Sequence, residues 1–350
     1  MFFKKRARST GLKTLHLHIG WPKCGSSSLQ WILGKNQDLL LKQGFYYPLV
    51  PGKGINFGNG KPLLRDNFRN ETKKKGSRFF QRHPDIVNIP DRPEYFRKNY
   101  LNTEAENLVI SAEGLYRGAR KWDLSYVYDH FKTIKIYWVI RPKLLRVQSS
   151  YLHGVRSGKF KLELIDQIDA DSYRNKFDDN LSYGEVLKFW SEMVGFDNLN
   201  IILMSDRYPG IVEQFFQAMM GYLPQQLKVG KNRLVRTGAV PTAAIMTLPK
   251  NSGNLAESME KIKFIRQRAD ELEITEETID VLTPEVYRRL SARYLPDDEY
   301  FVQNQQKFSI DDIRPDLTDM VASSTTLASV REWDDYLRLR KSLAEDGIKI

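Results

Sequence analysis

The residues best suited to chemistry lie near the amino terminus, where two glycines flank a lysine and three serines follow. Lys23 supplies a positive charge, and Ser26, Ser27 and Ser28 supply hydroxyl and backbone N–H donors. Donors of this kind at the start of a helix bind anions, because the first N–H groups of a helix have no partner within it and its amino-terminal end carries a partial positive charge. The segment therefore predicts a cradle for a phosphate group.

A strand and a helix must hold this cradle. Alternate apolar residues over 13–19 predict a buried strand, and the pattern over 26–43 predicts an amphipathic helix. His16 and His18 alternate with the apolar residues of the strand, so we expect them to be packed or hydrogen-bonded in the core. The order strand, glycine-rich turn, helix is the usual architecture of an anion-binding loop.

The spacing of Gly20 and Gly25 imitates a Walker A loop, but one position differs. That motif has a lysine directly after its second glycine, where the side chain reaches the β- and γ-phosphates. Here Ser26 holds that position, and Lys23 lies two residues before Gly25. The pattern therefore argues against an ATPase or a kinase.

A second segment predicts another anion site. The apolar run 134–140 predicts a strand, Arg141 and a proline end it, and Ser149 follows eight residues after Arg141 on a predicted helix. Arg141 then stands at the carboxyl edge of the sheet, where open α/β sheets bind ligands. A guanidinium binds phosphate through two parallel hydrogen bonds, and a hydroxyl can complete the shell.

These two segments resemble the donor site of sulfotransferases that use 3′-phosphoadenosine 5′-phosphosulfate (PAPS). The order Pro22-Lys23-Cys24-Gly25-Ser26-Ser27 is similar to the 5′-phosphosulfate loop, Pro-Lys-x-Gly-Thr/Ser-Thr/Ser. The segment from Arg141 to Ser149 resembles the 3′-phosphate site, although Ser150 precedes the aromatic residue and the Asn that often follows the arginine is missing. The resemblance implies PAPS as donor and PAP as product, and no metal is expected, because no His, Cys and carboxylate cluster has metal-ligand spacing. The donor-binding residues that it implies are Lys23, Cys24, Gly25, Ser26, Ser27, Ser28, Arg141 and Ser149.

Transfer of a sulfuryl group to an alcohol also needs a base that removes the hydroxyl proton. In this family the base is a His or Glu that follows a strand close to the donor loop, and Glu113 follows the predicted strand 108–111. The resemblance therefore implies Glu113 as the catalytic base, with Lys23 stabilising the leaving 5′-phosphate. Two alternatives stay open: Glu113 can be a structural carboxylate, and His153 is the reserve base.

Composition limits the classes of partner. The chain has 350 residues and a formal net charge of +11, which favours anionic ligands. Nucleic acid is not expected, because the chain has no zinc finger, helix-turn-helix or RNP-like pattern. Cys24 is the single cysteine, so no disulfide can form within the chain, and no His, Cys and carboxylate cluster has metal-ligand spacing. No stretch reaches the ~18 apolar residues of a membrane span, and we expect a cytoplasmic protein.

The predicted fold class is α/β, with a P-loop-like parallel sheet flanked by helices. The expected parts are a basic tail over 1–11, a sulfotransferase-like domain over 12–240 and a helical carboxyl-terminal extension over 241–350 that packs on the core. A basic and aromatic insertion over 48–93 has a composition suited to a sugar-like or acidic acceptor. Residues 311–350 either wrap the core or lack order, and the sequence does not decide.

The sequence therefore predicts an enzyme that transfers a sulfuryl group from PAPS to an acceptor hydroxyl, that of a carbohydrate or glycolipid. The alternative is a nucleotide- or polyanion-binding protein that keeps the cradle without catalysis. Glu113 discriminates between them, because an enzyme needs this carboxylate to face the donor sulfate. The sequence identifies neither the acceptor nor the oligomeric state.

Overall fold

The structure is a computed structural model of the chain, and it describes residues 13–21, 23–51, 53–55, 58–63, 89, 91–113, 115–116, 124–169, 182–229, 238–248, 255–274, 279–348 and 350. The chain divides into two compact units. The first contains Met1–Arg141 and Gly184–Asn232, and the second contains Pro142–Tyr183 and Arg233–Ile350. The tail expected over 1–11 and most of the insertion expected over 48–93 lie outside the described residues.

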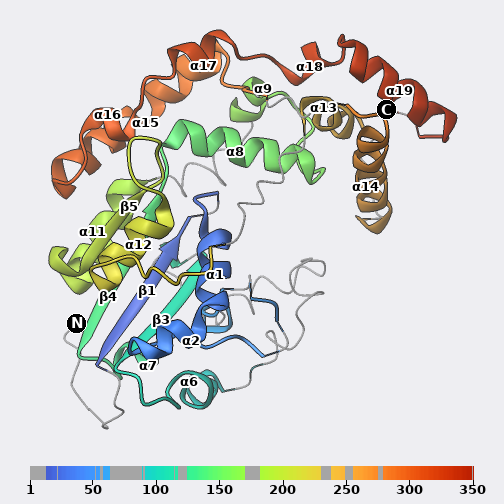
Figure 1. Cartoon of the computed structure of the whole chain (residues 1–350). Helices are drawn as coiled ribbons and strands as arrows, with labels where there is room; N and C mark the ends of the chain where they lie inside the picture. The colour runs from blue at the N-terminus through green and yellow to red at the C-terminus, as the bar shows by residue number, and fades with distance from the viewer. Residues whose placement is uncertain are drawn as a thin grey trace. The chain divides into compact units, whose positions relative to one another are not determined.

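The first unit is built on a five-stranded sheet in the order β2-β3-β1-β4-β5 (Figure 1). All four neighbouring pairs are parallel, so the carboxyl ends of the strands meet at one edge. The predicted α/β class is confirmed. The strands are β1 (Thr14–Gly20), β2 (Phe45–Tyr46), β3 (Asn107–Glu113), β4 (Thr133–Ile140) and β5 (Leu199–Leu203).

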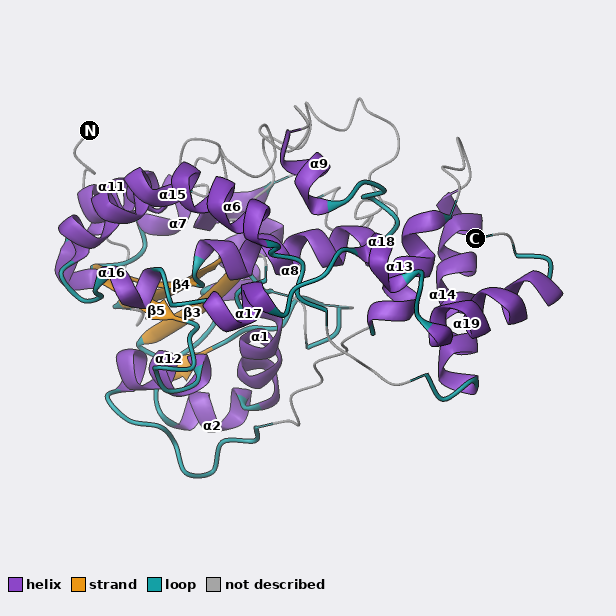
Figure 2. Ribbon diagram, turned by 90° about the horizontal axis from the view of Figure 1, so that it is seen from above, coloured by secondary structure: helices purple, strands orange, loops and turns teal. Residues whose placement is uncertain are grey.

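Helices cover both faces of this sheet, as Figure 2 shows. On one face lie α1 (Ser26–Lys35), α2 (Gln37–Lys42) and α12 (Ile211–Met220); on the other lie α6 (Arg92–Tyr100), α7 (Ser125–Tyr128) and α11 (Tyr183–Val194). Short 3₁₀ turns, η1 (Lys61–Leu63) and η4 (Phe196–Asn198), join these elements. Because the central strands are covered on both faces, they can be apolar along nearly their whole length.

The single helix expected over 26–43 is divided into α1 and α2 at Asn36. The Asn36 side chain donates to the carbonyl of Ile32 at 2.8 Å and accepts from the backbone N–H of Lys228 at 2.8 Å. An asparagine that bonds to the backbone in this way competes with the helical hydrogen bonds. Asn36 therefore ends one helix and ties the break to the segment after α12.

His16 is a core residue of β1, as the alternation predicted. Its ring bonds to the Tyr137 hydroxyl at 2.8 Å and to the Asn107 side-chain oxygen at 3.1 Å. Burial lowers the pKa of His16 to about 4, against the smaller opposing effect of the Asn107 hydrogen bond. His16 is therefore neutral at pH 7 and belongs to the packing of the sheet.

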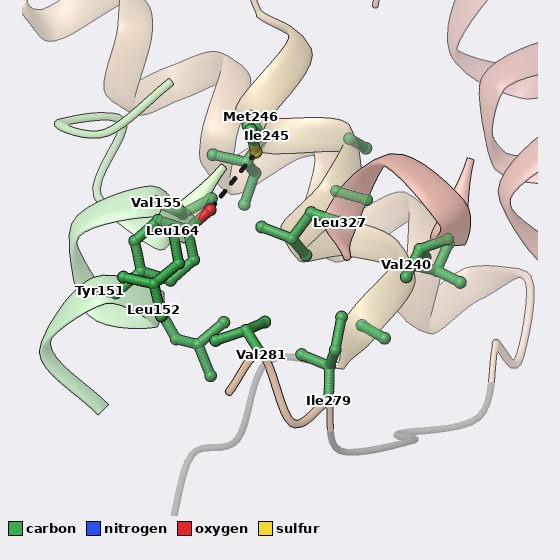
Figure 3. Close-up of a cluster of buried hydrophobic side chains, with 14 of the residues drawn as sticks. Tyr151, Leu152, Val155, Leu164, Val240, Ile245, Met246, Ile279, Val281 and Leu327 are labelled. Carbon is green, nitrogen blue, oxygen red and sulfur yellow. Dashed lines mark hydrogen bonds between the residues drawn. The ribbon is translucent and has the colours of Figure 1, made fainter. Parts of the chain in front are cut away.

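The second unit is helical and has its own apolar core (Figure 3). The core includes Tyr151, Val240, Met246 and Leu327, and α13 is buried along nearly its whole length because its residues are almost all small or apolar. Residues 311–350 contribute Leu339 and Leu343 to it. The helices are α8 (Lys143–Arg156), α9 (Leu164–Asp169), α13 (Ala239–Thr247), α14 (Leu255–Glu271), α15 (Pro284–Gln305), α16 (Ile310–Ile313), α17 (Thr318–Ala322), α18 (Leu327–Val330) and α19 (Asp334–Glu345).

The second unit also contains a segment from the middle of the chain, Pro142–Tyr183. Helices α8 and α9 precede residue 240, yet they pack with the carboxyl-terminal helices in the second unit. A buried ion cluster contributes to this unit: Lys143 forms salt bridges with Asp297 and Asp298, and its ammonium lies 4.7 Å from the ring centre of Tyr183. The unit is thus held by charge pairing at the start of α8 as well as by apolar burial.

Candidate functional site

The predicted anion loop connects β1 to α1 in the first unit. Two residues in it take the left-handed conformation, Lys23 with φ 70° and Gly25 with φ 77°. The backbone N–H of Cys24 donates to the Trp21 carbonyl at 3.3 Å, which closes the turn. Left-handed backbone in a residue other than glycine costs free energy and recurs at ligand-binding turns. The conformation of Lys23 therefore marks this loop as a candidate site.

The amino-terminal end of α1 has no acidic partner of its own. Gly25 is the N-cap residue and makes no side-chain cap, and the first turn contains no Asp or Glu. Ser27 and Ser28 are exposed at this end. A helix of ten residues whose amino terminus is not neutralised by its own side chains favours an external anion.

Ser26 is buried and lies against Gly20. It is 1% exposed, and a methyl group added to Gly20 would stand 2.0 Å from the Ser26 Oγ atom. Gly20 does not have a positive φ, so it is needed here for space and not for backbone freedom. At Gly25 both reasons apply, because an added methyl would also stand 2.3 Å from Ile211 Cδ1.

The carboxyl end of β3 places Glu113 beside this loop. In the parallel register Gly20 lies opposite Glu113, so the two Cα atoms are about one strand spacing apart, ~4.8 Å. Residues 111 and 113 share a face of β3 because side chains alternate along a strand. Ser111 contacts His18 on that face, so the half-buried Glu113 side chain leaves β3 on the same face. Gly114 lies outside the described residues.

Asn59 fixes the end of β3, a role that the sequence did not suggest. Its side chain donates to the Val109 carbonyl at 3.0 Å and accepts from the Ser111 N–H at 2.7 Å, and the N–H of Gly60 donates to the Ser111 carbonyl at 3.0 Å. One side-chain amide thus pairs with β3 as a neighbouring strand would. Asn59 is fully buried, and its position in the basic 48–93 segment gave no signal of this contact.

His18 lies directly beneath the loop. Its Nδ1 atom is 2.7 Å from Ser111 Oγ, and its ring meets the edge of Phe215 at a centroid distance of 6.0 Å. Burial lowers the pKa of His18 to about 3, so the ring is neutral at pH 7. The sequence predicted a core histidine here, but not its place under Gly20 and Ser26.

The other predicted site residues are distributed as follows. Arg141 follows β4 directly and is half-buried in the first unit, at the same edge of the sheet as Gly20 and Glu113. Ser149 and the exposed His153 are on α8 in the second unit, so their part in the site remains a sequence-based prediction. The Cys24 side chain is fully buried, and its N–H serves the turn itself.

Metal-ligating clusters and long apolar helices are both absent from the ranges that the structure describes. Within these ranges no group of three or more His, Cys, Asp or Glu side chains is arranged to hold a metal ion. Among the described helices, none combines the length and the apolar character needed to cross a membrane.

Comparison with known proteins gives matches among solved structures. No family model matches the chain, and no curated protein matches it. Among solved structures, a sulfotransferase from Alicyclobacillus acidocaldarius matches with a TM-score of 0.46 and 14% sequence identity, over 85% of this chain and 97% of that chain. At this identity and TM-score the likeness does not establish what this chain does.

Proposed function

We propose that this chain transfers a sulfuryl group from PAPS to an acceptor hydroxyl, with the loop between β1 and α1 holding the 5′-phosphosulfate. The observation that carries the proposal is the register of β3 against β1. It sets Glu113 beside Gly20, at the edge of the sheet where the left-handed Lys23 and the amino terminus of α1 also lie. A proton acceptor and an anion cradle on adjacent strand ends meet the needs of group transfer to an alcohol.

In the proposed reaction the acceptor oxygen attacks the sulfur of PAPS in line with the leaving group. Glu113 takes the hydroxyl proton as the new S–O bond forms, and the bond between sulfur and the bridging oxygen of the 5′-phosphate breaks. The electron pair of that bond stays on PAP. Lys23 and the amino terminus of α1 stabilise the charge that develops on the departing phosphate.

Arg141 is assigned to the 3′-phosphate, because its guanidinium follows β4 at the same edge of the sheet. Ser149 remains the partner suggested by the sequence. The 3′-phosphate distinguishes PAPS from ATP, so this assignment separates the proposal from a kinase. The acceptor class, a saccharide or glycolipid hydroxyl, rests on the basic and aromatic composition of residues 48–93.

The test is release of PAP from PAPS in the presence of a panel of saccharide and glycolipid acceptors, followed by mass spectrometry. Glu113→Gln should leave PAP affinity nearly unchanged and lower transfer by about 10² or more, the usual effect of losing a general base. Glu106→Gln is the matched control, since Glu106 directly precedes the amino-terminal end of β3, away from the carboxyl end that carries Glu113, and makes an exposed ion pair with Lys13. It should retain transfer.

Three outcomes would contradict the assignment in different ways. Full activity in Glu113→Gln, with loss of activity in His153→Ala, would transfer the role of base to His153. PAP binding without transfer to any acceptor would favour the alternative of a non-catalytic nucleotide-binding protein. Absence of PAP binding would refute the proposed donor site itself.

A further inference from the structure

His18 has one ring nitrogen that the packing leaves unsatisfied. The side chain is fully buried, and Nδ1 lies 2.7 Å from Ser111 Oγ. Nε2 has no hydrogen-bond partner among the described residues. An unsatisfied buried nitrogen costs about 1–3 kcal/mol, so packing alone does not explain a histidine at this position.

The unsatisfied nitrogen points at the anion loop. A methyl group added to Gly20 would lie 3.1 Å from His18 Nε2 and 2.0 Å from Ser26 Oγ. His18 Nε2 and Ser26 Oγ therefore lie around the same space beside the Gly20 Cα atom. The distance between these two atoms is at most the sum of their distances from the added methyl group. The only hydrogen bond found for the Ser26 hydroxyl within the described chain is a 3.5 Å contact with the Trp21 carbonyl, at the outer limit of such bonds.

The proton count favours one tautomer. Since His18 is neutral, its ring carries one N–H, either on Nδ1 or on Nε2. If the Ser111 hydroxyl donates to Nδ1, the ring proton is on Nε2 and can be donated to Ser26 Oγ. In the other tautomer Nε2 would accept the Ser26 proton and direct it away from an anion in the loop. Only the first tautomer supports an anion site.

We propose that His18 is a positioning residue for the anion loop: Ser111 donates to Nδ1, and when the 5′-phosphate binds, Nε2–H becomes the donor to Ser26 Oγ and directs the Ser26 hydroxyl proton toward that phosphate. This inference rests on the proposed function, because it takes the 5′ end of the nucleotide as the anion. His18 itself does not touch the ligand. It replaces the weak contact of Ser26 with Trp21 by a hydrogen bond that leaves the hydroxyl proton free for the phosphate.

Two amide variants of His18 separate this role from packing. The side-chain amide of Asn can occupy the position of Nδ1, and that of the longer Gln can occupy the position of Nε2. We expect His18→Gln to bind PAP within about threefold of the wild type and His18→Asn to bind about tenfold more weakly, as measured by calorimetry on the full chain. In a Ser26→Ala background the effect of His18→Asn should fall below about twofold, because the two residues act through one hydrogen bond.

Equal losses of affinity in the Asn and Gln variants, or an undiminished loss in the Ser26→Ala background, would overturn the inference. Imidazole ¹⁵N shifts of the unaltered chain give a second measurement that needs no variant of His18: an Nε2–H tautomer supports the inference, and an Nδ1–H tautomer overturns it. A wild-type chain that binds no PAP would refute the proposed function instead. A wild-type chain that binds PAP, with no difference between the two amides, would refute only the role of His18.

Discussion

Replacing Gly25 with alanine tests the backbone of the anion loop through two separate effects. Gly25 has φ 77°, and an L residue in this region costs about 1–2 kcal/mol. The new methyl would also stand 2.3 Å from Ile211 Cδ1, far inside a normal carbon–carbon contact, and overpacking of this kind costs about 1–3 kcal/mol. We therefore expect the free energy of unfolding to fall by about 2–5 kcal/mol.

Two further variants separate these effects. Gly221 has φ 83° and no atom within 4 Å of an added methyl, so Gly221→Ala should show the backbone cost alone, about 1–2 kcal/mol. Ile211→Val removes Cδ1, the atom in the clash, so combining it with Gly25→Ala should recover the overpacking part. Urea unfolding followed by tryptophan fluorescence measures the change, since Trp21 and Trp138 are buried in this unit.

The same variants test nucleotide binding, because the conformation of the loop determines the position of the amino-terminal end of α1. Gly25→Ala should weaken PAP binding, and Gly221→Ala, at the end of α12, should not. The reasoning is refuted if Gly25→Ala destabilises the chain no more than Gly221→Ala does. It is also refuted if Ile211→Val recovers nothing.

Two other predictions concern charge in the same unit. Lys23→Met should lower kcat for sulfuryl transfer, because in the proposed reaction its ammonium stabilises charge that develops in the transition state; a change in the KM for PAPS alone would reduce it to a binding group. Burial lowers the pKa of His18 to about 3 and that of His16 to about 4, below the 6.5 of an unperturbed histidine. As the pH falls, these histidines are therefore protonated in the unfolded chain before they are protonated in the folded chain. The contribution of each neutral histidine to the free energy of unfolding is fully present above pH 6.5 and is lost toward pH 4, by up to about 1.4 kcal/mol per pH unit. Urea unfolding at several pH values measures how the free energy of unfolding changes with pH. His16→Asn should lower the number of protons taken up on unfolding by one. An unchanged pH dependence would contradict the neutral, buried state of His16.

The long apolar strands and the turn between β1 and α1 could be predicted because their signals are local. The strands β1, β3, β4 and β5 are runs of apolar residues bounded by polar or glycine-rich turns, and the loop follows β1 directly. The edge strand β2 was missed because Phe45–Tyr46 is only two residues long. Local patterning does not reveal so short a strand, which depends on its pairing with the start of β3.

Contacts between distant residues account for what the sequence did not predict. The break at Asn36 is fixed by a hydrogen bond from Lys228, far away in the chain. Helix α15 continues past Pro296 to Gln305, and its buried Phe301 meets the ring of Tyr183 edge to face at a centroid distance of 5.5 Å. The pairing of Asn59 with β3 could not be predicted, because it depends on a turn that only the folded chain forms.

The contacts among the candidate site residues could also be predicted only in part. Glu113 was selected from a strand end and a family resemblance, and the register places it beside Gly20. The contact of His18 with Ser111 could not be inferred, because it needs the order of β3 next to β1 as well as the register. Sequence patterns identified the residues at the ends of strands, and the sheet order determined which of them are neighbours.

The most direct test of the donor assignment is a calorimetric titration of the full chain with PAP and with adenosine 5′-phosphate, repeated with Arg141→Ala and Ser149→Ala. We expect the unaltered chain to bind one PAP at least about tenfold more tightly than adenosine 5′-phosphate, since a guanidinium paired with a phosphate contributes about 1.5–3 kcal/mol. Arg141→Ala should remove that preference and leave the affinity for adenosine 5′-phosphate nearly unchanged. Equal affinities for the two nucleotides in the unaltered chain, or no binding of PAP, would contradict the account.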